Sequence, residues 1–187
     1  MYIQGSYPNG IYVLKKGMLK VFQANYDGSI QILFLYAPGE TFGYRPILSN
    51  EYQPVSVAAL EDCELDFLER NIFIDIQKKS HVLTNQLLVS LSHEFTVLTN
   101  RMNVFAQRGI KERLALALLI LNEKFKTGQQ LIAEIRLTRT DLANFVGTSL
   151  ENLIRTINYF KEKNLIKVKG KSIYIENMQQ LFILSAI

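Results

Sequence analysis

The sequence predicts an α+β protein in which an antiparallel β domain comes first, a long helix follows and a winged helix-turn-helix ends the chain. Three observations support this fold class. β-rich runs punctuated by glycine precede residue 70, apolar residues then recur at helical spacing, and two short helices broken at Gly147 come before an alternating apolar and basic segment. We expect the three parts to cover residues 1–80, 81–107 and 108–187.

Composition restricts the class of protein. The 187 residues are 48% hydrophobic, which supports a packed core. The chain has no apolar run long enough to span a bilayer and no signal-peptide pattern at its N-terminus, so we expect a cytoplasmic protein without membrane contact. Cys63 is the only cysteine, which excludes a disulfide, a Cys-rich zinc site and a four-cysteine iron–sulfur cluster within one chain. We predict no metal site.

Positive charge is concentrated in the C-terminal part. Residues 1–107 carry 8 Lys and Arg against 10 Asp and Glu, whereas residues 108–187 carry 13 against 7. A basic half beside a slightly acidic half indicates a polyanionic partner for one domain, although a solvated lysine-rich face is the ordinary alternative.

The segment from Ile11 to Tyr36 predicts strands joined by a tight turn. Asp27-Gly28 lies between two β-rich runs, and Gly28 can adopt the positive φ that a hairpin turn requires. Two more short strands are expected over 55–60 and 63–68. We expect these strands to close into a roll or jelly-roll.

A long helix is predicted by the spacing of its apolar residues. Six of them alternate at intervals of three and four, as in the seam of a coiled coil, which predicts a homodimer: Leu88, Leu91, Phe95, Leu98, Met102 and Phe105. The alternative is a helix packed on its own β domain, for which Leu87, Val97 and Val104 supply a flanking stripe. We expect both faces to be used.

Gly109 interrupts the helical pattern and marks an expected hinge. Beyond it, apolar residues from Ile110 to Phe125 repeat at helical spacing, Gly128 closes that helix, and a short strand is expected over Leu131–Ile135.

The segment from Leu137 to Ile157 predicts a helix-turn-helix. Leu142, Ala143 and Val146 form the inner face of the first helix, and Leu153 and Ile157 that of the second. Gly147 allows the chain to reverse, and Thr148 or Ser149 can cap the second helix.

The second helix carries the candidate base-reading residues. Helical phase assigns Leu150, Leu153, Ile154 and Ile157 to the inner side and directs Ser149, Glu151, Asn152 and Arg155 to solvent. Glu151 can accept a hydrogen bond from cytosine and Arg155 can donate two to guanine. An ordinary ion pair between residues four apart is the alternative.

The segment from Asn164 to Ile175 predicts a β-hairpin wing with Gly170 at its turn. Its basic residues can meet phosphates, and the absence of stacking aromatics on this face favours duplex DNA over single strands. The expected phosphate contacts are Thr138, Arg139, Thr148, Ser149, Lys167, Lys169 and Lys171.

With these motifs in place, the chain resembles the Crp/Fnr superfamily, the cyclic-AMP receptor protein type of regulator. The match is most specific from Leu137 to Ile175 and weaker from Gly5 to Leu68, where Gly17, Gly28, Gly39 and Gly43 fall at the turns of the family's β-roll. The resemblance implies a cyclic-nucleotide-binding-like roll, a dimerisation helix, a palindromic DNA site and contact with RNA polymerase. The chain begins where the family's roll is already under way, so we expect an abbreviated roll or a truncated start.

Two departures from the family concern ligand and base recognition. Tyr44 and Pro54 stand where the resemblance implies a Glu for the ribose and an Arg for the phosphate of a cyclic nucleotide, so we expect neither cyclic AMP nor another cofactor to bind. The effector is unknown, with Tyr44 and Arg45 as candidate pocket residues. Leu150 stands where the cyclic-AMP type has a base-reading Arg, and a leucine can pack on the methyl group of thymine.

We therefore predict a non-enzymatic transcription regulator that binds duplex DNA. The alternative is a small-molecule-binding signalling module whose winged helix makes only protein contacts. Ligation of a haem iron by His81 or His93 is a weaker alternative. No nucleophile motif or glycine-rich phosphate loop supports an enzyme.

Overall fold

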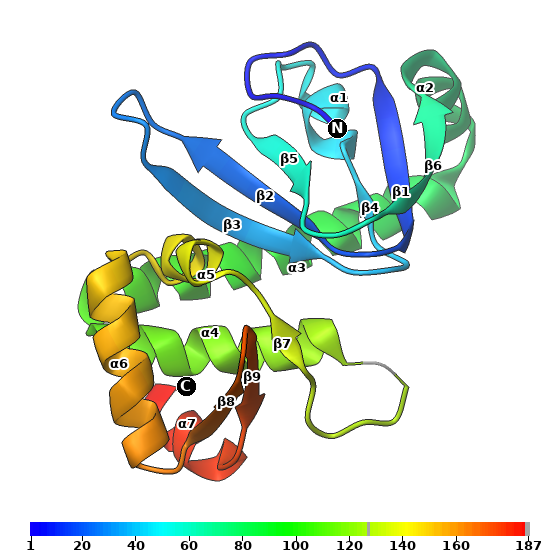
Figure 1. The fold of residues 1–187 in the computed structure, drawn as a ribbon. Helices are drawn as coiled ribbons and strands as arrows, with labels where there is room; N and C mark the ends of the chain where they lie inside the picture. Colours follow the sequence, from blue (N-terminus) through cyan, green and yellow to red (C-terminus); the bar gives the residue numbers. More distant parts are fainter. Residues whose placement is uncertain (127, 186–187) are drawn as a thin grey trace. The chain divides into compact units, whose positions relative to one another are not determined.

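A computed structural model describes residues 1–126 and 128–185 of the chain. It divides into two compact units, Met1–Met102 and Asn103–Ile187, and each is described by itself. The α+β fold class predicted from the sequence is confirmed, with antiparallel strands first, a long helix next and a winged helix-turn-helix last (Figure 1).

The N-terminal unit contains two three-stranded antiparallel sheets. One has the order β4-β1-β6, formed by β4 (Thr41–Phe42), β1 (Gly10–Lys16) and β6 (Glu64–Glu69). The other has the order β3-β2-β5, formed by β3 (Ile30–Tyr36), β2 (Leu19–Ala24) and β5 (Ser56–Ala59). The side chains between them form a common core that includes the fully buried Leu14, Leu19, Val21 and Phe42. Alternation along the strands therefore builds the expected roll.

The hairpin of β2 and β3 contains the predicted turn and an irregularity that was not predicted. Gly28 has a φ of +80°, as a tight turn requires. The pairing register shifts between Val21 and Phe22, which face Phe34 and Ile32, so that Leu33 is the extra residue of a β-bulge. The Arg101 guanidinium, from the long helix, donates hydrogen bonds to the carbonyls of Ile32 and Leu33. The side chain of Arg101 therefore links α3 to main-chain atoms of the bulge.

Three helices complete this unit, and the longest continues beyond it. They are α1 (Tyr44–Ser49), α2 (Arg70–Lys79) and α3 (His81–Gln107). A second apolar cluster of Tyr44, Ile47 and Phe73 joins α1 to α2. Leu83, Leu87 and Leu91 of α3 pack against this cluster. One stripe of α3 therefore packs on its own N-terminal unit, as expected, but it contains Leu91, which was assigned to the seam, whereas Val97 of the expected stripe is 37% exposed.

A second stripe of α3 faces solvent. Leu88, Phe95 and Met102 lie seven residues apart and have exposed fractions of 57%, 71% and 64%. The other members of the expected seam, Leu91, Leu98 and Phe105, are half-buried. Exposed apolar side chains at a seven-residue interval lie on one side of a helix, and we call these three residues the ridge.

The C-terminal unit is built on α4 (Ile110–Phe125), which follows Gly109. Leu114, Leu118 and Leu121 are completely buried, and α5 (Arg139–Val146), α6 (Leu150–Glu162) and α7 (Met178–Ser185) all contact α4. A small sheet of order β7-β9-β8 closes the unit, formed by β7 (Ile135–Arg136), β9 (Ser172–Ile175) and β8 (Ile166–Lys169) (Figure 1).

The prediction of a strand over Leu131–Ile135 is wrong for most of its length, because β7 contains only Ile135 and Arg136. Leu131 is 81% exposed, and its carbonyl accepts a hydrogen bond from the Asn122 amide at 3.3 Å. The Asn122 side-chain oxygen accepts another from the Ala133 N–H at 2.9 Å. A buried side chain of α4 therefore satisfies backbone groups that a strand would have paired.

Of the helices in the part of the chain that the structure describes, none is long and apolar enough to cross a membrane.

Candidate nucleic-acid interface

The helix-turn-helix is shaped by two side-chain caps and one left-handed residue. Thr138 caps α5, and its hydroxyl oxygen accepts a hydrogen bond from the Asp141 N–H at 3.0 Å. Ser149 caps α6 by accepting from the Asn152 N–H at 3.3 Å, which decides between the two expected caps. Gly147 has a φ of +70° and separates the two helices. Such caps satisfy N–H groups that a helix start leaves unpaired.

The packing of α5 and α6 confirms the predicted inner faces with two exceptions, both on α6. Leu142, Val146 and Leu153 are at most 1% exposed. Leu150 and Ile154, which helical phase assigned to the inner side, are 43% and 45% exposed, so both assignments are wrong. The phase of a single helix leaves residues at the border of its apolar stripe ambiguous, and Ile154 lies at that border.

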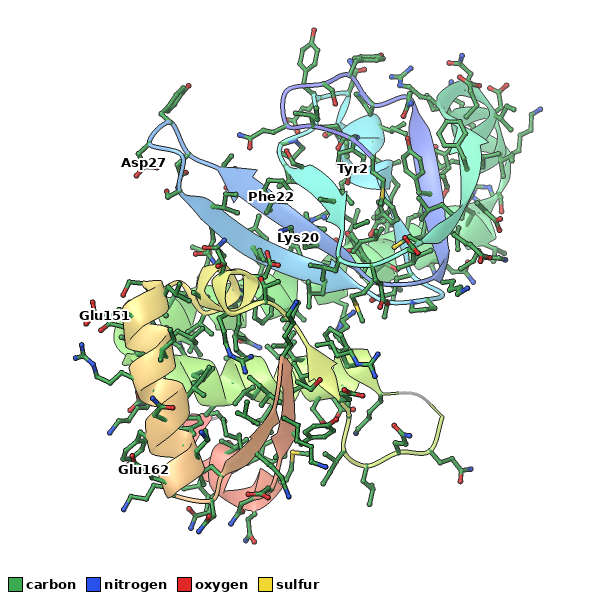
Figure 2. The ribbon with its side chains drawn as sticks, in the orientation of Figure 1. Tyr2, Lys20, Phe22, Asp27, Glu151 and Glu162 are labelled. Carbon is green, nitrogen blue, oxygen red and sulfur yellow. The ribbon has the colours of Figure 1, made fainter. Side chains whose placement is uncertain are left out.

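The exposed face of α6 carries both apolar and charged groups. Leu150 is 43% exposed, and Ile154 follows it by one helical turn. Glu151 and Arg155 have side chains that are 82% and 72% exposed and form an ion pair of 2.7 Å. Figure 2 shows Glu151 on the outer side of α6, near its first turn. Since exposed pairs of this kind contribute little free energy, both side chains remain available to a partner. Asn152, the fourth candidate, is half-buried.

The wing, formed by β8, β9 and the turn between them, carries three exposed lysines. Lys167 and Lys169 lie on β8, Lys171 lies in the turn, and all three are exposed. At the base of the wing, Glu134 accepts hydrogen bonds from Arg136 at 2.5 Å and from Ser172 at 2.6 Å, which lower the pKa of its carboxyl group to about 2. The wing is therefore held by a carboxylate that stays ionised at neutral pH.

Two of the expected phosphate contacts also have structural partners. Arg139 donates a hydrogen bond to the Lys171 carbonyl at 3.2 Å and so joins the start of α5 to the wing turn. The Thr148 N–H donates to the Ala143 carbonyl at 3.1 Å. With Ser149 at the cap of α6, these residues lie at helix starts, where N–H groups and the helix dipole favour phosphate.

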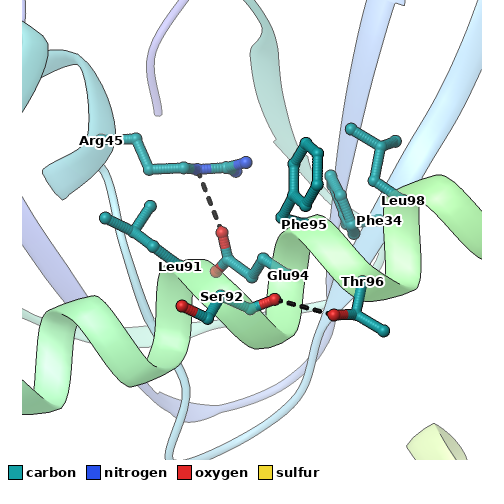
Figure 3. Close-up of a pocket in the computed structure, with 8 residues that line it drawn as sticks. All are labelled: Phe34, Arg45, Leu91, Ser92, Glu94, Phe95, Thr96 and Leu98. Atoms are coloured by element: carbon teal, nitrogen blue, oxygen red, sulfur yellow. Dashed lines mark hydrogen bonds and ion pairs between the residues drawn. The ribbon is translucent and has the colours of Figure 1, made fainter.

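The candidate effector residues lie in the N-terminal unit, and one of them, Arg45, lies at a cavity of about 600 Å³ (Figure 3). Arg45 lines this cavity, and its Nε lies 3.4 Å from a carboxylate oxygen of Glu94 on α3. It also donates a hydrogen bond to the Tyr36 hydroxyl at 3.2 Å. Tyr44 is buried, and its hydroxyl donates to Glu94 at 3.0 Å.

The groups at Tyr44, Pro54 and Arg45 differ in chemistry from the ligands that the resemblance implies for a cyclic nucleotide. Burial is the main cause that raises the pKa of Tyr44, and the neighbouring Glu94 raises it further. The phenol therefore stays neutral and offers no negatively charged acceptor to a ribose hydroxyl. Pro54 has no side-chain donor. Arg45 is already neutralised by Glu94, and a phosphate placed there would meet the negative charge of Glu94.

A β-roll, a long helix and a winged helix-turn-helix with an exposed basic wing together define a DNA-binding transcription regulator. Comparison with protein families supports this class, because residues 1–80 match the model of a cyclic nucleotide-binding domain and residues 112–182 match that of a Crp-like helix-turn-helix domain. The chain belongs to the Crp/Fnr family of transcription regulators. It is a regulator and not an enzyme.

Similar proteins come from several bacteria. The chain is 28% identical over 180 residues to the anaerobic regulatory protein of Aggregatibacter actinomycetemcomitans, covering 94% of this chain and 68% of that protein. It is 29% identical over 176 residues to the fumarate and nitrate reduction regulatory protein of Yersinia pestis, covering 91% and 69%. The structure of FixK2 from Bradyrhizobium japonicum shares the fold with a TM-score of 0.90 at 19% identity, covering 100% of this chain and 92% of that one.

The exposed Ile154 and its buried neighbour generate the first prediction. Leu153→Ala should lower the free energy of unfolding by about 2–5 kcal/mol, because it removes buried methyl groups and leaves a cavity. Ile154→Ala should lower it by less than about 1 kcal/mol, because that side chain is half exposed, and should change base preference instead. Chemical denaturation and selection of sites from random duplexes measure the two effects. Equal destabilisation by both variants would contradict the outward placement of Ile154.

Proposed function

We propose that this regulator binds duplex DNA as a homodimer on a two-fold symmetric site, with α6 in the major groove and the wing on the backbone. The observation that carries the proposal is the outer face of α6, where Leu150, Glu151 and Arg155 are exposed together in the first two turns. Arg155 can donate to guanine, Glu151 can accept from cytosine, and Leu150 can pack on a thymine methyl group. The exposed lysines of the wing supply phosphate contacts that do not depend on sequence.

The homodimer is supported by the ridge of Leu88, Phe95 and Met102 on α3. Large apolar side chains exposed along one side of a helix are typical of an interface. The seven-residue interval is the repeat of a coiled coil, so a second copy of α3 is the occupant that fits. Two copies related by a two-fold axis would present two α6 helices to a palindrome.

The alternative, a small-molecule-binding module whose winged helix contacts only proteins, differs in its response to salt. Binding of random duplex DNA that weakens steeply with salt concentration supports the DNA-binding function, since neutralised phosphates release counterions. The slope is the discriminating measurement, because a protein-binding surface would not show it towards DNA.

We further propose that the signal, if the protein has one, is not a cyclic nucleotide. The ion pair of Arg45 with Glu94 and the neutral, buried Tyr44 support this proposal. Because its partner is DNA, the cytoplasm is the expected compartment, and RNA polymerase is the expected further partner of a promoter-bound dimer.

The assembly prediction uses the exposed ridge and avoids Leu91, which packs on the apolar cluster of α1 and α2. Phe95→Asp with Met102→Asp should convert the dimer to a monomer, because each carboxylate would be buried against its symmetry mate. Ile72→Asp is the matched control, since Ile72 is 51% exposed on α2 and lies outside the ridge. Sedimentation velocity measures the mass of each variant. A double variant that remains dimeric would remove α3 as the interface.

The DNA prediction concerns the symmetry and base content of the preferred site. Selection from random duplexes should enrich palindromes with a G·C pair addressed by Arg155, a T·A pair facing Leu150, and half-site centres about one helical turn apart. Arg155→Ala should weaken binding by about 1–3 kcal/mol and relax the G·C preference, whereas Lys169→Ala should weaken all sequences alike and lower the salt slope by about one unit. Leu150→Arg should shift the outer preference from T towards G. Enriched sites without two-fold symmetry would refute the proposed mode of binding.

The ligand prediction is that neither cyclic AMP nor cyclic GMP binds at concentrations up to about 1 mM, where an affinity of only about 4 kcal/mol would be detected. Isothermal titration calorimetry measures this directly, and DNA binding should be the same with and without either nucleotide. A micromolar dissociation constant for one of them would show that the Arg45–Glu94 pair opens to admit a phosphate.

A further inference from the structure

Arg113 lies in the first turns of α4 and contacts two different parts of the C-terminal unit. Its Nη1 donates a hydrogen bond to the Gly147 carbonyl at 2.9 Å. On the other side, its guanidinium carbon lies 5.5 Å from the centroid of the Phe105 ring, in the last turn of α3. One side chain therefore joins the end of the long helix to the turn of the helix-turn-helix.

Gly147 is a position from which the direction of α6 can be controlled. Its N–H and that of Thr148 both donate to the Ala143 carbonyl, which ties the start of the turn to α5. Its carbonyl is tied to α4 by Arg113, two residues before the Ser149 cap. Because a peptide unit is planar, holding the N–H of Thr148 and the carbonyl of Gly147 fixes the orientation of the peptide that leads into α6.

An apolar side chain could fill the same space without leaving a buried N–H group unpaired. The Arg113 Nε is buried, and none of the described residues accepts a hydrogen bond from it. Burying a donor in this way costs free energy, so Arg113 is a poor choice for packing alone. An apolar side chain could not make the hydrogen bond to the Gly147 carbonyl, which requires a long side chain with a donor.

We propose that Arg113 is a positioning residue for DNA recognition, which sets the first turn of α6 relative to the last turn of α3. This inference rests on the proposed function. In a dimer paired through α3, the separation of the two α6 helices depends on every link between α3 and the turn before α6. Loosening the Arg113 link should therefore weaken binding to a symmetric site, which needs both helices in register, more than binding to random duplex.

The test compares Arg113→Met and Arg113→Lys with Arg108→Met. Arg108 is exposed, and its replacement removes the same charge five residues away. Arg113→Met should lower the ratio of affinities for the selected symmetric site and random duplex by about tenfold, because one charge-assisted hydrogen bond is lost. Arg108→Met should leave that ratio within about twofold of the unchanged protein, and Arg113→Lys, which keeps a donor, should recover most of the loss. The salt slope should be the same for Arg113→Met and Arg108→Met.

A second measurement needs no DNA and separates this inference from the proposed function. The Asn152 and Leu153 N–H groups bond to Ser149 at the start of α6, and in Arg113→Met their hydrogen exchange should be faster by about tenfold, with the centre of α4 unaffected. Unchanged exchange, an unchanged affinity ratio, or a lysine variant that behaves like the methionine variant would each overturn the role of Arg113. If the unchanged protein prefers no symmetric site, the proposed function fails, and the exchange rates still decide whether Arg113 holds the turn.

Discussion

The burial of one face of α4 is the constraint on which the presentation of α6 depends. Leu114, Leu118 and Leu121 are completely buried, and three other helices contact this one. The recognition helix has only 13 residues, and a helix of that length is marginal in water without tertiary packing. Its buried Leu153 and Phe160 supply that packing, which leaves the opposite face free for polar and apolar groups that contribute little to the fold.

The inner and outer faces of α6 have separate roles, so residues on the outer face can change with little effect on stability. Residues that hold the helix, such as Leu153, are separate from residues that face outward, such as Leu150 and Arg155. Ser149 belongs to both groups, because it caps the helix and is also an expected phosphate contact. Outward residues can therefore vary among related regulators, whereas the cap and the inner face are restricted by folding.

The sequence contained enough information for most of the fold, because periodicity reports which face of an element is buried. The strands around Gly28, the long helix and both helices of the helix-turn-helix follow from local patterns. Leu150 and Ile154 could not be placed correctly, because residues at the edge of an apolar stripe have the same phase whether they are covered or not. The partners of Arg113 and Arg101 lie 34 and 68 or more residues away, and no local pattern reports such contacts. Two apolar stripes on α3 were expected from the sequence. Only the structure shows which residues belong to each stripe, with Leu91 packed on the N-terminal unit and Phe95 exposed to solvent.

The attachment of the β2–β3 hairpin to α3 has a consequence for how this sequence can evolve. Arg101 binds carbonyl oxygens of the bulge, and every amino acid supplies the same carbonyl. Side chains at positions 32 and 33 can therefore drift under selection for the roll's interior without breaking the attachment. Position 101 has no such freedom, since only a long side chain with several donors spans two neighbouring carbonyls. Among descendants of this chain, we therefore expect substitutions to be tolerated at positions 32 and 33 of the hairpin and to be rejected at position 101.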